Sequence, residues 1–152
     1  MGERSDLNVF ISFVRTNRHK AERLAQALRD YGILVWLEQD QITNGPDWQN
    51  AIRQQIRQGA FFIACFSSQY NARRKSRMNE ELMLAIEELR QRPLEKTWFI
   101  PVFLNECTAP NWSIGGGASL LNLQWVDLSR DWEMGIQNIV RMIDPAGKHI
   151  IK

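Results

Sequence analysis

The chain has 152 residues, which suits one domain with a complete hydrophobic core. Hydrophobic residues make up 44% of it and charged residues 24%, as in ordinary soluble globular domains. The formal net charge is +2, too small to predict binding to nucleic acid. No run approaches the roughly 18 consecutive apolar residues of a membrane span, so we expect neither a membrane protein nor a membrane partner.

The cysteines and the first residues of the chain predict a cytoplasmic protein, and the histidines predict no metal site. Cys65 lies within an apolar run and Cys107 is far from it, so both are expected to be reduced thiols. The first residues contain no apolar signal core. His19 and His149 are too few and too far apart for a metal site. We therefore expect no metal and no added cofactor.

Short apolar runs alternate along the chain with stretches in which apolar residues recur at helical spacing. The predicted strands cover residues 8–14, 33–37, 60–66, 98–104 and 123–128. Helical stripes begin at Ala21, Trp48 and Met78, and a last helix begins at Trp132. The first three helices are predicted to end at Gly32, Gly59 and Pro93.

This alternation predicts an α/β fold. Strands that alternate with helices form right-handed crossovers, so the sheet is parallel and covered on both faces. The segment 105–121 contains Pro110 and Gly115-Gly116-Gly117, for which we expect a loop or a helical turn. In open sheets of this kind, ligands bind beyond the carboxyl ends of the strands. Neither a dinucleotide-binding G-x-G-x-x-G after the first strand nor a phosphate-binding G-x-x-x-x-G-K-S/T is present.

Glu81 is the principal candidate for a catalytic group. It lies roughly a quarter turn from the centre of an apolar stripe near the start of the third helix. We expect Glu80, Glu87 and Glu88 to face solvent, and Glu81 to border the core in a partly desolvated position. Such positions raise the pKa of carboxyl groups and are common in active sites. The alternative is a boundary glutamate that the helix dipole favours in the first turn.

Two further segments are candidates for function. The loop Glu38–Trp48 carries acidic residues and the turn signal Asn44-Gly45-Pro46. Trp48 either seals the core at a helix start or presents its ring to a flat ligand. The basic run Arg73–Arg77 is either a solvated loop or a site for a phosphate or an acidic partner. Arg15, at the end of the first strand, is better placed to bind a diphosphate.

Taken together, these stretches resemble the TIR (Toll/interleukin-1 receptor) domain in its bacterial form. The matching stretches are Val9–Phe13, Leu28–Trp36, Ile42 with Gly45 and Trp48, Ile52, Phe62–Ser68 with Tyr70, Asn79–Leu82, Ile100–Val102 and the closing helix. The resemblance gives a domain over residues 8–144. Residues 1–7 form a tail, and residues 145–152 form a second tail or a linker to another domain.

The resemblance implies a flavodoxin-like fold with five parallel strands in the order 2-1-3-4-5 between two layers of helices. Many members of this family cleave NAD⁺ at the nicotinamide–ribose bond, and some cyclise the product. Their essential glutamate lies in the third helix directly before Leu or Ile, which is Glu81 here. The expected activity is therefore that of an NAD⁺ nucleosidase, giving ADP-ribose or a cyclic isomer in antiphage defence.

The resemblance also implies a substrate pocket and an assembly loop. The candidate substrate-binding residues are Phe13, Arg15, Trp36, Glu38, Asp40, Trp48, Ser67 and Arg77. The loop residues expected to mediate contacts between TIR domains are Thr43, Asn44, Gly45 and Pro46. A head-to-tail contact of this kind does not close, so it favours filaments over dimers. Arg77 stands where many relatives carry an aromatic residue.

Three other functions remain open. The chain could be a non-enzymatic TIR adaptor, or a virulence-type mimic that only binds other TIR domains. A nucleoside deoxyribosyltransferase-like enzyme would share the sheet and a catalytic glutamate. A nucleic-acid binder would use Arg73–Arg77, and its binding would depend strongly on salt.

Overall fold

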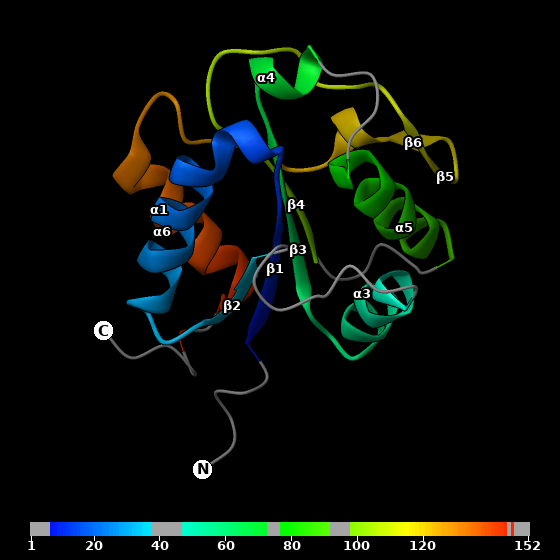
Figure 1. Cartoon of the computed structure of the whole chain (residues 1–152), viewed down its shortest axis with the longest axis horizontal. Coiled ribbons are helices and arrows are strands. Elements are labelled where there is room, and N and C mark those ends of the chain that lie inside the picture. The colour runs from blue at the N-terminus through cyan, green and yellow to red at the C-terminus, as the bar shows by residue number, and fades with distance from the viewer. Residues whose placement is uncertain (1–6, 38–46, 73–76, 92–97, 146, 148–152) are drawn as a thin grey trace.

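The structure is a computed structural model that describes residues 7–37, 47–72, 77–91, 98–145 and 147. Of Arg77 it describes only the backbone. Within these ranges, five strands form one parallel sheet in the order β2-β1-β3-β4-β7 (Figure 1). Since β7 is the fifth strand of this sheet along the chain, the predicted order 2-1-3-4-5 and the flavodoxin-like fold are confirmed.

The strands and helices follow the predicted alternation closely. The main sheet consists of β1 (Asn8–Ser12), β2 (Leu34–Leu37), β3 (Phe61–Phe66), β4 (Phe99–Phe103) and β7 (Val126–Asp127). The longer helices are α1 (Arg18–Arg29), α3 (Trp48–Arg57), α5 (Arg77–Gln91) and α6 (Trp132–Ile143). Helices α1 and α6 cover one face of the sheet, and α3 and α5 cover the other (Figure 1). Within the described ranges, no helix is both long and apolar enough to cross a bilayer.

Alternate residues of strand β1, which lies between β2 and β3, face opposite helix layers. Ile11 and, just beyond the strand, Phe13 belong to the core formed with α1 and α6. Phe10 and Val14 belong to the core formed with α3 and α5. Because side chains alternate along a strand, Ser12 lies in the same row as Phe10 and Val14. Strand β1 therefore presents the hydroxyl group of Ser12 to the layer that contains α5.

Two glycines end helices as predicted. Gly32 follows α1 with a φ angle of 87°, and Gly59 follows α3 with a φ angle of 102°. Positive φ strains residues that carry a Cβ atom, so glycine is preferred at these turns. Each turn leads into the next strand within one or two residues. The carboxyl ends of the strands are thereby brought to a single edge of the sheet.

The segment 105–121 differs from the prediction. It contains an antiparallel hairpin of β5 (Ser113–Gly115) and β6 (Ala118–Ser119), followed by the 3-10 turn η3 (Leu120–Asn122). Gly115, Gly116 and Gly117 have φ angles of 96°, 60° and 80°, which let the chain reverse in so short a span. The helical turn was expected, whereas the strands were not, because a run of glycines indicates a loop by composition alone.

Candidate functional site

Helix α5 carries Glu81 into the protein interior. The helix packs against β1, against α3 and against the β5–β6 hairpin. More of its circumference is therefore buried than the single apolar stripe predicted from the sequence. Glu81 is 0% exposed, as are Met78, Leu82 and Ala85. The sequence predicted a half-buried position at the core boundary, and the structure corrects this to full burial. A buried carboxylate requires hydrogen bonds or charged partners, because leaving water is costly for a charge.

Ser12 is a partner of Glu81. It is the last residue of β1 and 0% exposed, and its hydroxyl donates a hydrogen bond to Oε1 of Glu81. The two residues are separated by 69 positions in the sequence. Their bond therefore exists only because α5 crosses the carboxyl end of β1. This places Glu81 at the edge of the sheet where open α/β folds bind ligands.

A network of buried and surface amides joins the ends of the neighbouring strands. Ser67, which follows β3, donates to Asn17 Oδ1 at 2.6 Å and accepts from the backbone N–H of Tyr70 at 3.0 Å. Gln69 Oε1 accepts from Asn17 Nδ2 at 3.1 Å and from Asn105 Nδ2 at 3.0 Å. The network links residues that follow β1, β3 and β4. Polar groups that follow three different strands therefore meet at this edge of the sheet.

Tyr70 connects the same edge to the start of α5. It lies in the short helix α4 (Ser68–Asn71), and its hydroxyl donates to Asn79 Oδ1 at 2.6 Å. Burial raises the pKa of Tyr70 to about 12, so the phenol keeps its proton at neutral pH. Because Asn79 precedes Glu81 by two residues, this bond fixes the first turn of the helix that carries Glu81.

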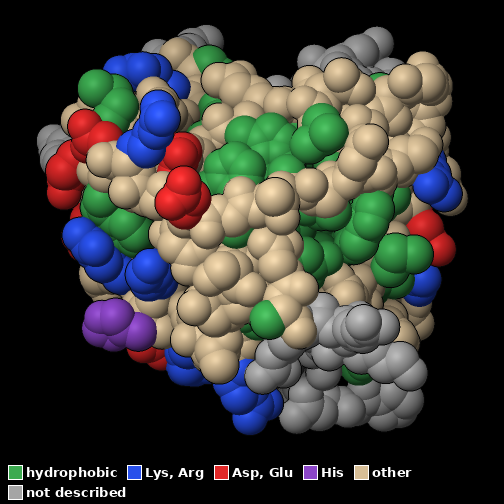
Figure 2. Space-filling model, turned by 90° about the horizontal axis from the view of Figure 1, so that it is seen from above, with side chains coloured by type: hydrophobic (Ala, Val, Ile, Leu, Met, Phe, Trp, Pro, Cys, Tyr) green, Lys and Arg blue, Asp and Glu red, His purple; other side chains and the backbone are tan. Residues whose placement is uncertain are grey.

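A separate open cleft lies on the other side of the sheet. Its volume is about 720 Å³, and it is lined at the ends of β4 and β7 by residues such as Leu104, Cys107 and Asp127, and from the helix side by Lys20 and Arg23. Figure 2 views the molecule from the carboxyl ends of the strands and shows hydrophobic side chains at the centre, with charged side chains of both signs toward the left and right sides. The lining of this cleft includes neither Glu81 nor Ser12, so the cleft is distinct from the candidate site.

The family comparison supplies the remaining observation. Residues 9–140 match the family model described as the TIR domain. The chain belongs to the TIR domain family. This confirms that the motifs identify a TIR domain, and the family includes NAD-cleaving members. No curated protein matches the chain significantly.

The predicted aromatic residues of the TIR domain pocket divide between the two faces of the sheet. Phe13 is 1% exposed and belongs to the core with α1 and α6, on the face opposite Glu81. Trp36 and Trp48 are partly buried and pack against the core that contains α5. The structure therefore places the two tryptophans in the layer of Glu81. It does not bring Phe13 beside that residue.

The remaining predicted residues lie at the rim or outside the described ranges. Arg15 is exposed in the 3-10 helix η2 (Arg15–Asn17), directly beyond β1. Ser67 is 0% exposed and engaged with Asn17, so its hydroxyl serves the amide network. The predicted residues that lie outside the described ranges are Glu38, Asp40, Thr43, Asn44, Gly45 and Pro46, together with the side chain of Arg77.

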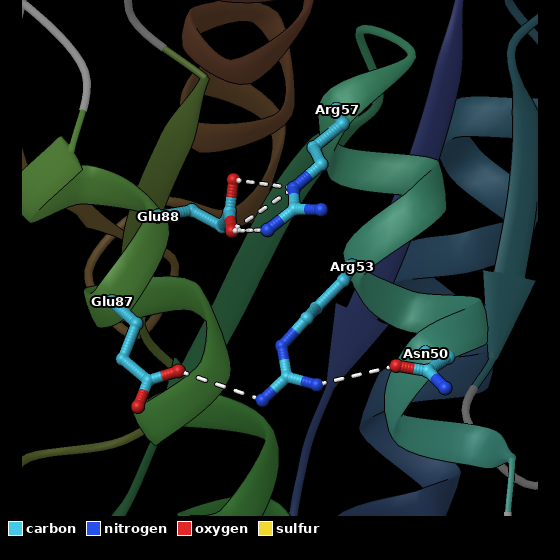
Figure 3. Close-up of polar contacts among 5 residues, drawn as sticks. All are labelled: Asn50, Arg53, Arg57, Glu87 and Glu88. Atoms are coloured by element: carbon cyan, nitrogen blue, oxygen red, sulfur yellow. Dashed lines mark hydrogen bonds and ion pairs between the residues drawn. The ribbon is translucent and has the colours of Figure 1, made fainter.

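Glu88 was predicted to face solvent, and this prediction is wrong. Glu88 is 3% exposed, and the guanidinium of Arg57 from α3 donates to both of its carboxylate oxygens (Figure 3). The shortest of these contacts, from Nη2 to Oε2, is 3.0 Å. A second pair, Arg53 with Glu87, joins the same helices at 3.6 Å with an exposed carboxylate (Figure 3). Helix α3 is thus fastened to α5 by two ion pairs of different burial.

Sequence reasoning missed Ser12 and Glu88, although each left a signal. Seven residues complete almost two helical turns, so Glu88 lies on the same side of α5 as Glu81. Ser12 is a polar residue in the row Phe10, Ser12, Val14 of a strand predicted to be buried. A polar residue at such a position needs a partner, and that partner could not be named before the crossing of β1 and α5 was known.

Proposed function

We propose that this TIR domain cleaves the N-glycosidic bond between nicotinamide and ribose in NAD⁺, with Glu81 as the catalytic carboxylate. One observation carries the proposal: Glu81 is fully buried at the carboxyl end of strand β1 and accepts a hydrogen bond from Ser12. Membership of a family with NAD-cleaving members supports it. A carboxylate is the group that such a reaction needs, because positive charge develops on the ribose as the bond breaks.

In the proposed reaction the bond between the ribose C1′ and the pyridinium nitrogen breaks, and its electron pair neutralises the departing nicotinamide. The carboxylate of Glu81 stabilises the resulting oxocarbenium-like ribose and hydrogen-bonds its hydroxyls. Water then attacks C1′ and loses a proton, giving ADP-ribose. Attack by a ribose hydroxyl or an adenine nitrogen of the same molecule gives a cyclic isomer instead.

Other residues are assigned supporting roles. Arg15 is exposed beyond β1, where its guanidinium can bind the diphosphate through two parallel hydrogen bonds. Trp36 and Trp48 share the layer of Glu81, so either indole can stack on the nicotinamide. Phe13 takes no part, because its side chain belongs to the core on the opposite face of the sheet. NAD⁺ is the substrate, and no further cofactor enters the reaction.

The proposal requires an opened form of the site. Because Glu81 is 0% exposed, a ribose can reach its carboxylate only after surrounding groups move. We assign this opening to self-association of TIR domains through the segment 43–46. A head-to-tail contact then builds filaments, and activation by assembly suits a bacterial antiphage response in which NAD⁺ is depleted or converted into a signal.

Chromatography of NAD⁺ incubated with concentrated protein tests the proposal. The parent should release nicotinamide together with ADP-ribose or a cyclic isomer, and Glu81→Gln should release none. Glu80→Gln is the matched control, because Glu80 is the exposed neighbour on the same helix and should leave the rate unchanged. Equal, measurable rates for the parent and Glu81→Gln would show that Glu81 is not the catalytic carboxylate, and absence of cleavage by both would favour a non-enzymatic interaction module. Deoxynucleosides added beside NAD⁺ separate the proposed activity from base exchange.

A further inference from the structure

Ser12 occupies a place where the core would favour an apolar side chain. It lies between Phe10 and Val14 in a row that faces the α5 layer, and it is 0% exposed. Its neighbour in the adjacent strand β3 is Ala64, whose side chain offers the hydroxyl no acceptor. Burying a hydroxyl without a hydrogen bond is costly, and the Ser12 hydroxyl donates its hydrogen bond to the carboxylate of Glu81.

The geometry points to Ser12 as a positioning residue for the carboxylate of Glu81, an inference that rests on the proposed function. The hydroxyl holds Oε1 in one orientation at the carboxyl end of β1. Because it donates its proton, it also favours the ionised form of the carboxylate, which is the form that stabilises an oxocarbenium ion. Ser12 touches no reacting atom in this scheme and acts through Glu81.

Packing energy alone does not account for this pair. Two buried polar groups that face each other are often less stabilising than two well-packed apolar groups of similar volume. A structure that retains the polar pair beside a ligand-binding edge therefore retains it for chemistry. The neighbouring hydroxyl of Tyr70 donates to Asn79, and the hydroxyl of Ser12 donates to Glu81.

Several other charged groups lie on or near α5. From α3, Arg57 pairs with Glu88 and Arg53 pairs with Glu87. These two glutamates lie at least six residues beyond Glu81 along α5. From the strand edge, Arg15 is exposed in η2. From α5 itself, Glu80 is exposed, and Arg90 donates to the carbonyl of Ser113. The side chain of Arg77 lies outside the described part of the chain.

The test compares Ser12→Ala with the parent in steady-state NAD⁺ cleavage over a range of pH. We expect kcat to fall about 10- to 100-fold, as for a lost hydrogen bond to a charged group, with KM nearly unchanged. Without the donated proton the ionised carboxylate is less favoured, so the acid limb of the kcat/KM profile should move to higher pH. A purely structural role would not move that limb.

Ser129→Ala is the matched control. The Ser129 hydroxyl also donates to a carboxylate, Asp127 Oδ1 at 2.5 Å, but this pair lies at β7, away from Glu81. It should change neither kcat nor the pH profile. Ser12→Cys, with a weaker donor of similar size, covers the case in which Ser12→Ala weakens folding. It should shift the acid limb in the same direction by a smaller amount, and circular dichroism checks that each variant is folded.

The outcomes separate this inference from the proposed function. If the parent cleaves NAD⁺, Glu81→Gln does not, and both Ser12 variants keep the parent's kcat and pH profile, the positioning role is wrong and the enzyme stands. If the parent cleaves no NAD⁺ even in concentrated or assembled form, the proposed function fails and this inference fails with it. Loss of kcat together with the shifted acid limb supports both.

Discussion

Helix α5 buries two carboxylates that differ in their partners. Glu81 accepts a hydrogen bond from the Ser12 hydroxyl, and Glu88 accepts from the Arg57 guanidinium. A guanidinium balances the charge of its partner, whereas a hydroxyl leaves the charge in place. Glu88 is therefore suited to a structural role between α3 and α5. The Ser12 hydroxyl orients Glu81 at the edge of the sheet where open α/β folds bind ligands.

The structural role of Glu88 can be measured through Arg57. Arg57→Met removes the guanidinium from a carboxylate that is 3% exposed, so unfolding in urea should show a loss of about 2 kcal/mol. This loss of stability is smaller than that for a fully buried ion pair, because the Arg57 side chain is itself 50% exposed. Arg53→Met on the same helix is the control and should cost less than about 0.5 kcal/mol, because its partner Glu87 is exposed. Equal losses would show that burial of Glu88 does not decide the energy.

The two cysteines should be poor nucleophiles in the folded protein. Burial raises the pKa of Cys65 to about 12, and burial together with the negative charge of Asp127 raises the pKa of Cys107. The thiolate is the reactive form, so a raised pKa lowers reactivity at any pH below it. Iodoacetamide at pH 8 should leave Cys65 unmodified until the protein is denatured and should modify Cys107 more slowly than a free thiol. Asp127→Asn should speed the labelling of Cys107 and leave Cys65 unchanged.

Strands and helix ends that depend on a few neighbouring residues could be predicted from the sequence. Apolar runs gave the five sheet strands, and Gly32 and Gly59 gave the helix ends, because each depends on a few neighbouring residues. Features set by packing between distant segments could not be predicted. The burial of Glu88 depends on α3 lying across α5, and the Ser12–Glu81 bond joins residues 69 positions apart. Glu81 could be identified as the candidate residue from its angular position on the helix, but its full burial could not be predicted.

The β5–β6 hairpin offers a test of backbone conformation at the level of an element. Gly115 has a φ angle of 96°, beyond the left-handed region, and a Cβ atom there would lie 3.4 Å from Cγ of Arg90. Gly115→Ala should lower the free energy of unfolding by about 2 kcal/mol. Gly116 has a φ angle of 60° and no atom within 4 Å of a built Cβ, so Gly116→Asn should cost less than about 1 kcal/mol. Thermal unfolding of both variants tests this: backbone strain predicts that Gly115→Ala destabilises the protein more than Gly116→Asn does, and equal losses would contradict it.

At the scale of the whole molecule, full burial of Glu81 connects catalysis to assembly. A carboxylate with 0% exposure cannot contact a ribose in the described arrangement. If neighbouring copies stabilise an opened site, the active species is an oligomer, and its fraction rises with protein concentration by mass action. The rate of NAD⁺ loss per molecule should then rise with concentration and level off once assembly is complete.

A mixing experiment separates assembly from catalysis. Glu81→Gln protein should be inactive but able to associate, because the change keeps the shape of the side chain. Added in excess to dilute parent protein, it should raise the parent's rate of NAD⁺ cleavage, since it supplies neighbours without supplying carboxylates. An excess of denatured protein should not. Rates strictly proportional to the parent's concentration down to nanomolar protein, with no response to the inactive variant, would show that a single copy opens its own site.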